Sequence, residues 1–420
     1  MALSASNELS TYSPLPTSAR PASLEAASGS ASSFDTSIIL QRPASRWLYR
    51  LRASSGWIVA ALLLVYSWKQ RRVESKEECW DPYRALGYIH RPPTSSSNSI
   101  RWIPYPPSGA RASNSFSLAD PARVITDDVD LPAEALKWAA PDYGDRLRRR
   151  NEDQGAMDGL EWSRGRRVVF VGDSHDRSNV EAFCNQHSSS GAVYSTPHYH
   201  IKAHCSFPDL NLTLTSWFHY GVSPAHESEP PDAWNIPAIP TSRPNENPSP
   251  YSIEERLREV WVPDAAAAAR PELIVLNSFF WDVRYFAYRA RHFNHSLHLQ
   301  REERALTYSE LAWHRARVQV LVESVREAFP GVPVMFRLGQ QRRTHRNEGN
   351  VAVYQMNQSL RALMAELRVP IFEWAKLITG ESHYNDDQHL SPGAPATLFG
   401  DMALYYLKRA VEGWDKCPKT

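Results

Sequence analysis

Residues 168–175, which read VVFVGDSH, decide how this chain folds. The first four are β-branched or aromatic, which is typical of a buried strand in a parallel sheet. Gly172 permits a tight turn, and Asp173 and Ser174 suit the start of a following helix. This arrangement predicts Ser174 at the carboxyl edge of the sheet, where open α/β folds bind their ligands. An ordinary helix cap without any chemistry is the simpler interpretation of the same residues.

A corner of this kind can present a nucleophile. The Ser174 hydroxyl is the candidate, and its backbone N–H points out of the helix start toward a developing oxyanion. A serine needs a base and an orienting carboxylate, and residues 386–393, DDQHLSPG, contain both. One turn of that loop lets Asp386 hold one nitrogen of His389 while the other nitrogen faces Ser174. A polar loop with a surface histidine is the alternative, and Asp387 is a rival carboxylate at a less suitable spacing.

Two further residues are candidate donors to the oxyanion. Asn277 ends an apolar run at 273–277 that predicts a strand, so its amide would lie on the same sheet edge. Gly221 follows a predicted strand at 212–218, and its backbone could approach a substrate closely. One such donor typically changes a rate by roughly 10²–10³. The alternatives are a turn residue for Asn277 and an ordinary loop glycine for Gly221.

Composition and charge argue against several classes of protein. The chain has 420 residues, enough for one large domain or two ordinary ones. Its net charge is +1 with 22% charged residues, so no excess of basic charge supports nucleic-acid binding. No Cys-x-x-Cys pair supports zinc, and the histidines at 198, 200 and 204 have no acidic partner pattern nearby. We therefore expect no bound metal and place His198, His200 and His204 on strand or solvent faces.

From residue 166 onward, predicted strands alternate with predicted helices. Strands separated by helices imply crossover connections and a parallel sheet. We therefore expect an α/β fold, a three-layer αβα sandwich around a central parallel sheet. The expected strands are 168–171, 212–218, 273–277, 332–338 and 371–374, and the expected helices are 177–186, 253–261, 308–329, 351–367 and 396–411.

The N-terminal part of the chain has a different character. Residues 1–45 are rich in Ser, Ala and Pro and predict a disordered cytosolic tail. Residues 53–72 contain a short apolar core between aromatic residues and predict an uncleaved transmembrane signal anchor, with a buried core helix as the alternative. Residues 73–160 are rich in proline and predict a lumenal stem with irregular wrapping, followed by the main domain at 161–420.

The orientation of the anchor follows from the residues after it. Basic residues flank both ends, so the positive-inside rule does not decide. Glycosylation sequons begin at Asn211, Asn294 and Asn357, and four cysteines suit two disulfides in an oxidising compartment. These features favour a single-pass type II protein of the Golgi or another secretory membrane, with its body in the lumen. The expected cysteine pairs are Cys184 with Cys205 and Cys79 with Cys417.

Taken together, the motifs resemble the SGNH, or GDSL-type, hydrolase superfamily. They are most similar to its PC-esterase branch, which includes the plant trichome-birefringence-like polysaccharide O-acetyltransferases. The resemblance covers roughly residues 165–412 and departs from the plant enzymes at His175, where they have leucine, and after the late histidine, where their Trp-Cys is missing. The residues that carry it are Gly172, Asp173, Ser174, Arg177, Cys184, Asn277, Ser278, Trp281, Asp282, Phe336, Arg337, Asp386, His389, Pro392 and Gly393.

The resemblance implies an SGNH fold with a Ser174–His389–Asp386 triad. It also implies that the arginine after the serine and the one in the Phe-Arg motif take part in the site. Arg177 and Arg337 are therefore candidate substrate-binding residues, with ion pairs as the alternative for both. Ser174, with the two donors described above, would form the oxyanion site.

The function that the resemblance implies is that of a membrane-anchored lumenal serine O-acyltransferase, specifically an O-acetyltransferase, or an esterase. We expect it to act on a glycan or polysaccharide through an acyl-serine intermediate, with no bound cofactor and with an acyl donor such as acetyl-CoA. Transfer and hydrolysis both stay open, because the outcome depends on which acceptor reaches the acyl-enzyme first. The alternative is a catalytically silent protein of the same fold that binds a glycan or a Golgi partner.

Overall fold

The computed structural model describes residues 80–90, 100–105, 138–152, 154–223, 248–343, 350–380 and 383–414, together with Tyr66 and Trp234. All of these except Tyr66 belong to one compact unit, Arg72–Thr420. The predicted tail, the rest of the predicted anchor, Cys79 and Cys417 lie outside the described residues. Within the described part, no helix combines the length and the apolar character needed to cross a bilayer.

A seven-stranded sheet forms the centre of the unit, in the order β4-β5-β6-β3-β7-β8-β9. The strands from β6 to β9 are parallel, whereas β5 pairs antiparallel with β6 and β4 pairs antiparallel with β5. The sheet is therefore mixed, which corrects the prediction of a parallel sheet. The β4–β5 hairpin was missed although β5 alternates as a half-buried strand does, with Ala203, Cys205 and Phe207 buried and the residues between them partly exposed. The bounds are β3 Arg167–Gly172, β4 Val193–His198, β5 Lys202–Phe207, β6 Leu212–Phe218, β7 Leu273–Leu276, β8 Val334–Arg337 and β9 Ile371–Phe372.

The helices lie where the sequence predicts them, with shifts of a few residues at their ends. Helix α8 was missed, because its aromatic residues favour strands as much as helices. Helix α5 begins at Ser174, three residues before the predicted start. The bounds are α5 Ser174–Gln186, α6 Ile253–Arg256, the π-helical turn η3 Leu257–Trp261, α7 Val262–Ala267, α8 Phe280–His292, α9 Tyr308–Ala328, α10 Val351–Glu366, α11 Trp374–Leu377 and α12 Ala394–Gly413.

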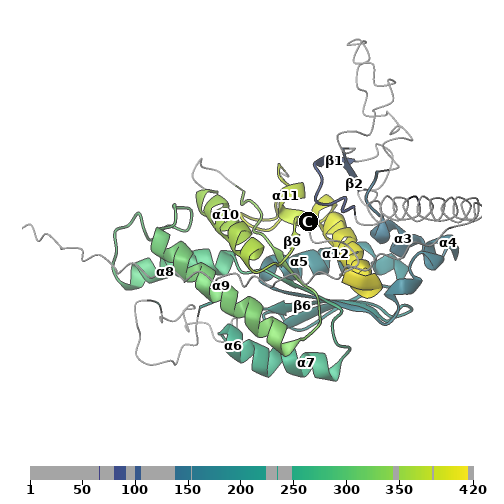
Figure 1. Ribbon diagram of the computed structural model, residues 1–420, viewed down its shortest axis with the longest axis horizontal. Helices are drawn as coiled ribbons and strands as arrows, with labels where there is room; N and C mark the ends of the chain where they lie inside the picture. The colour runs from purple at the N-terminus through teal and green to yellow at the C-terminus, as the bar shows by residue number, and fades with distance from the viewer. Residues whose placement is uncertain are drawn as a thin grey trace, which may run out of the picture. The chain divides into compact units, whose positions relative to one another are not determined.

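Helices cover both faces of the sheet, as an αβα sandwich requires. Phe170 of β3 packs against Phe399 of α12, with ring centroids 4.6 Å apart. Trp217 of β6 stacks on Trp261 of η3. Because Trp217 pairs with Val171 and not with Phe170, its side chain points to the opposite face of the sheet. Figure 1 shows this arrangement, with α5 and α12 on one side of the sheet and α6, α7 and α9 on the other.

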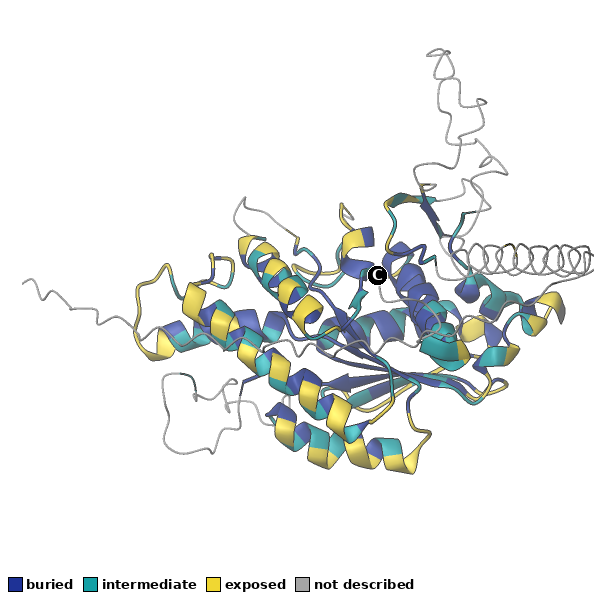
Figure 2. Cartoon of the chain, viewed as in Figure 1, coloured by how far each residue is buried: buried dark blue, intermediate teal, exposed yellow. Residues whose placement is uncertain are grey.

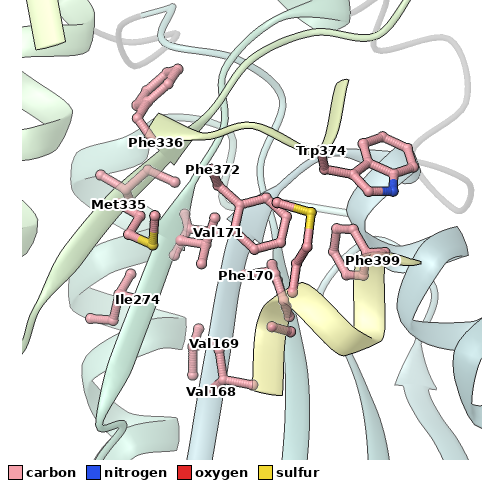
Figure 3. Packing of buried hydrophobic residues seen from close by; sticks show 14 of the residues in the cluster. Val168, Val169, Phe170, Val171, Ile274, Met335, Phe336, Phe372, Trp374 and Phe399 are labelled. Atoms are coloured by element: carbon pink, nitrogen blue, oxygen red, sulfur yellow. The ribbon is translucent and has the colours of Figure 1, made fainter. Parts of the chain in front are cut away.

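Strand β3 is the innermost part of the core. All six of its residues are buried, and Figure 2 shows the surrounding strands in the same dark blue. Figure 3 shows Phe170 of this strand next to Phe372 and Phe399, with Trp374 beside Phe399. Truncating a fully buried aromatic residue such as Phe170 to alanine typically costs about 3–5 kcal/mol. Ser174 therefore follows directly from a strand that the core holds rigidly.

Part of the predicted stem is regularly structured. Strands β1 (Gly87–His90) and β2 (Arg101–Pro104) form an antiparallel hairpin, and helix α3 (Tyr143–Arg149) is followed by α4 (Gln154–Asp158). Several hydrogen bonds connect this region to α12, among them one from Tyr406 Oη to the Asp81 carboxylate at 3.0 Å and one from the Gly144 N–H to Asp401 at 2.6 Å. The described parts of 80–158 are thus packed on the domain, and their short elements left no periodicity for the sequence to reveal.

The predicted Cys184–Cys205 disulfide is present in the structure. The two Cα atoms lie 5.4 Å apart, which is within the normal range for a disulfide. The bond joins helix α5 to strand β5 and so attaches the antiparallel hairpin to the helix that begins at Ser174. The predicted Cys79–Cys417 pair lies outside the described residues.

Candidate active site

Helix α5 begins at the glycine–aspartate–serine corner because reciprocal hydrogen bonds cap its first turn. Asp173 Oδ1 accepts the His175 N–H at 2.9 Å, and Asp176 Oδ2 accepts the Asp173 N–H at 3.3 Å. Such a capping box satisfies backbone donors that have no partner inside the helix. Ser174 is the first helical residue, so its own N–H has no intrahelical acceptor. Its hydroxyl and its N–H both lie at the carboxyl end of β3.

Ser174 meets the histidine loop at this corner. His389 Nε2 lies 2.8 Å from Ser174 Oγ, and His389 Nδ1 lies 2.7 Å from Asp386 Oδ2. With Asp386 accepting the Nδ1 proton, the Nε2 lone pair faces the serine hydroxyl. The structure therefore brings together the three residues that the sequence predicts as a triad, although Ser174 and His389 are 215 positions apart.

The backbone of the histidine loop holds Asp386 in place. Asp386 Oδ1 accepts the N–H groups of Gln388 and His389, both at 2.7 Å. Partial burial favours a higher pKa for Asp386, but these N–H groups and the imidazole outweigh it, so the pKa lies below its ordinary value. Asp386 is therefore ionised at neutral pH and can stabilise an imidazolium. The Asp386 side chain is 56% exposed and that of His389 26%, so the pair is open to solvent.

The two additional oxyanion donors predicted from the sequence face inward instead. Asn277 is fully buried, and its Nδ2 donates to the Arg337 carbonyl at 2.9 Å. The Gly221 N–H donates to His219 Nδ1 at 3.1 Å. Gly221 is required for the turn itself, because its φ is +85° and a Cβ there would clash with a carboxylate. Both predictions are therefore corrected, and the Ser174 N–H is the donor of the predicted three that faces no internal acceptor.

The two predicted substrate-binding arginines are also engaged inside the protein. Arg337 pairs with Asp176 through Nε–Oδ1 at 2.7 Å and Nη2–Oδ2 at 2.8 Å, with both side chains 1% exposed. It therefore holds α5 against β8 and cannot reach a substrate, which corrects that prediction. The Arg177 guanidinium lies 3.5 Å from the ring centroid of Tyr199 and donates to its carbonyl at 2.9 Å. A substrate role for Arg177 stays a prediction.

His175 is a residue of the site to which the sequence assigned no role. Its ring lies between Phe280 and His389, with centroid distances of 4.3 and 4.5 Å. Its Nδ1 lies 2.9 Å from Asp173 Oδ1, and its Nε2 lies 3.2 Å from the Gln388 carbonyl oxygen. The signal in the sequence was the departure from leucine at this position, because a polar ring replaces an aliphatic side chain beside the candidate nucleophile.

The three sequons differ in accessibility. Asn211 and Asn294 are exposed, in turns where φ is +50° and +51°. Asn357 lies in α10, and its amide is bonded to Gly339 at both ends, accepting the N–H at 3.0 Å and donating to the carbonyl at 2.8 Å. These bonds make Asn357 less accessible than the other two asparagines in the folded protein, and its glycosylation stays a prediction as well. Glycosylation of the other two stays a prediction.

The three clustered histidines lie on the antiparallel hairpin. His198 ends β4, His200 lies in the turn, and His204 lies in β5 with its Nδ1 3.2 Å from Thr215 Oγ1. In the ranges that the structure describes, no group of three His, Cys, Asp or Glu side chains is arranged to hold a metal ion.

Solved structures similar to this chain include ester hydrolases. An acetylxylan esterase from Geobacillus stearothermophilus aligns at 9% identity with a TM-score of 0.31, covering 59% of this chain and 96% of its own. A member of the lipolytic G-D-S-L family from Veillonella parvula aligns at 11% identity with a TM-score of 0.29, covering 58% and 98%. No protein-family model matches the chain, and no curated protein matches it. Likeness at this level carries no conclusion about chemistry, which rests on the geometry of the site.

Proposed function

We propose that this protein is a serine esterase or O-acyltransferase that works through an acyl-serine intermediate. The observation that carries the proposal is the hydrogen-bonded chain Ser174–His389–Asp386. A hydroxyl within 2.8 Å of an imidazole nitrogen has a base to accept its proton, and an ionised carboxylate behind the imidazole stabilises the resulting cation. Because the serine stands at the start of a helix, its own N–H is in position to donate to the oxyanion.

The reaction divides into two steps of the same kind. Ser174 Oγ attacks the carbonyl carbon of an acyl ester or thioester, and His389 Nε2 takes the hydroxyl proton. The tetrahedral intermediate then collapses, the leaving group receives that proton, and the acyl group stays on the serine. Water or a sugar hydroxyl attacks the acyl-serine, passes its proton to His389, and the serine recovers it on release. Water gives hydrolysis and a sugar hydroxyl gives transfer.

Within this proposal, the acyl group is acetyl and the acceptor or substrate is a glycan. Two features support this class. The sequence motifs resemble those of polysaccharide O-acetyltransferases, and the Asp386–His389 pair is open enough to solvent for a bulky substrate to approach. A donor such as acetyl-CoA, a lumenal position in the secretory pathway and an anchor at 53–72 belong to the same proposal.

A catalytically silent, glycan-binding protein is the second candidate. It is favoured by one observation, that the Gly221 N–H and one N–H of the Asn277 amide donate to internal acceptors. An oxyanion site with the Ser174 N–H alone would be weaker, since each missing donor typically costs roughly 10²–10³ in rate.

Ester turnover separates the two candidates. The full chain is incubated with an O-acetylated oligosaccharide to follow acetate release, and with acetyl-CoA with and without an unacetylated oligosaccharide to follow transfer. We expect acetate release or transfer by the wild type and its loss in Ser174→Ala. Ser178→Ala, one turn along α5, is the matched control and should retain full activity. A wild type without turnover in either arm, or a Ser174→Ala variant with unchanged turnover, contradicts the proposal.

A further inference from the structure

His175 lies directly against His389 and is almost wholly buried, with 2% of its surface exposed. Its ring plane is inclined by 22° to that of His389 and by 29° to that of Phe280, so the three rings form one stack. A stack of this kind restrains the tilt of an imidazole but leaves it free to slide within its plane. Asp386 holds the imidazole within its own loop, so a further restraint is needed to hold that loop at a fixed distance from the serine.

This further restraint acts on the backbone next to His389. The His175 Nε2 lies 3.2 Å from the carbonyl oxygen of Gln388, the residue immediately before His389. A carbonyl can only accept, so a proton on Nε2 makes this contact a hydrogen bond. The bond joins the first turn of α5, which carries Ser174, to the loop that carries His389. It therefore spans the two pieces of chain whose separation decides whether the serine can lose its proton.

The other side of the His175 ring is held by Asp173. Its Oδ1 lies 2.9 Å from Nδ1, and it is also an acceptor, so a doubly protonated ring satisfies both contacts. Burial lowers the pKa of His175, while the ionised Asp173 opposes that effect and the nearby His389 and Arg337 add to it. A neutral ring keeps only one of the two hydrogen bonds, and the bond to the Gln388 carbonyl requires the proton to be on Nε2. In both protonation states the ring stays between Phe280 and His389.

We propose that His175 is a positioning residue for His389. The stack sets the tilt of the proposed catalytic imidazole, and the contact with the Gln388 carbonyl sets its distance from Ser174. This inference rests on the proposed function. Leucine at this position would fill the same space next to Phe280 but would give the Gln388 carbonyl no donor. The histidine thus fixes the position of the loop through a hydrogen bond, which an aliphatic side chain packed in the same place cannot form.

The test compares His175→Phe with wild type in the full chain. Phenylalanine keeps a flat ring in the stack and removes both hydrogen bonds. We expect kcat for 4-nitrophenyl acetate to fall roughly 10- to 100-fold with KM unchanged, because a small misplacement of a base has effects of that order. The rate at which a fluorophosphonate labels Ser174 should fall in parallel. His187→Gln is the matched control, since His187, directly after α5, is also buried, and its ring nitrogens lie against the carbonyls of Phe183 and Gly144, away from the histidine loop.

The outcomes separate positioning from a merely structural role. The control should lower the unfolding temperature and leave kcat unchanged, whereas His175→Phe should change kcat in a protein that is still folded. If His175→Phe does not fold, His175→Leu, which also gives the Gln388 carbonyl no donor, decides alone, and a lowered kcat at unchanged KM supports the inference. A kcat within two-fold of wild type in the folded variant overturns it. If the wild type itself neither turns over the ester nor reacts with the fluorophosphonate, the proposed function fails first.

Discussion

Two acid–base pairs flank the same serine, one inside the protein and one at its surface. The Asp176–Arg337 pair and the Asp386–His389 pair have similar N–O distances, 2.7 Å in each case. They differ in solvent access, with 1% exposure for both members of the first pair and 56% and 26% for those of the second. A buried pair holds elements together and cannot exchange its partner, whereas an exposed pair can gain and lose a proton and meet a substrate. Burial and residue type together separate structure from chemistry here, because a guanidinium keeps its proton whereas an imidazole can release it.

The largest effect should come from the base of the exposed pair. His389→Gln leaves Ser174 without a group that can accept its proton, so we expect kcat to fall by roughly 10⁴–10⁶. The free energy of unfolding should change by less than about 0.5 kcal/mol, because the side chain is partly exposed. His383→Gln on the same loop is the control for the substitution itself. Equal losses of activity in His389→Gln and His383→Gln would show that any change in this loop impairs the protein, and would contradict a specific role of His389 as the base.

Breaking the buried pair should have the opposite signature. Arg337→Met leaves Asp176 as an uncompensated buried charge, so we expect the free energy of unfolding to fall by about 3–5 kcal/mol. Denaturant unfolding measures this loss. The double variant Asp176→Leu/Arg337→Met removes both charges and should recover most of the stability. A single variant as stable as the wild type would show that the pair does not hold α5 against β8.

The carboxylate of the exposed pair should matter less than its histidine. Asp386→Asn preserves the shape of the loop but no longer stabilises an imidazolium, and we expect kcat to fall roughly 10²–10³-fold. Removing a buried triad carboxylate costs about 10⁴, and water partly screens this exposed one. Asp387→Asn, the neighbouring carboxylate, is the matched control. A larger loss in the control than in Asp386→Asn would reassign the orienting role.

The smallest effect should appear in the stability of the protein at low pH, and it should come from Asp264, a carboxylate far from the serine in sequence. Asp264 bonds to Arg167, to Lys202 and, at 2.8 Å, to Trp217 Nε1. Burial favours a higher pKa, but these donors outweigh it and lower the pKa from 3.8 to about 2. The stability contributed by Asp264 is therefore present above pH 3.8 and is lost as the pH falls toward 2. Unfolding followed as a function of pH should show this decline, with a shallower decline in Asp264→Asn.

The sequence located the pieces of the candidate site but not all of their roles. Ser174 was placed correctly because an apolar run followed by Gly-Asp-Ser has few alternatives to a strand, a turn and a helix. Asp386 and His389 were paired correctly because they are three residues apart on one loop. Asn277 and Arg337 were misassigned, since sequence shows that a side chain follows a strand but not which acceptor lies beside it. His175 received no role because its partners, Phe280 and Gln388, are distant in sequence.

By itself, the amino-acid sequence determined the layered α/β architecture, the position of the serine at a sheet edge, and the hydrogen bond between Asp386 and His389. These are local properties of hydrophobic periodicity, turn residues and short spacings. The tertiary structure alone decided that the sheet has an antiparallel edge, that Arg337 is internal, and that His175 lies against His389. Each of these features depends on which distant segments pack together and on which atoms lose contact with water. A short stretch of sequence contains neither kind of information.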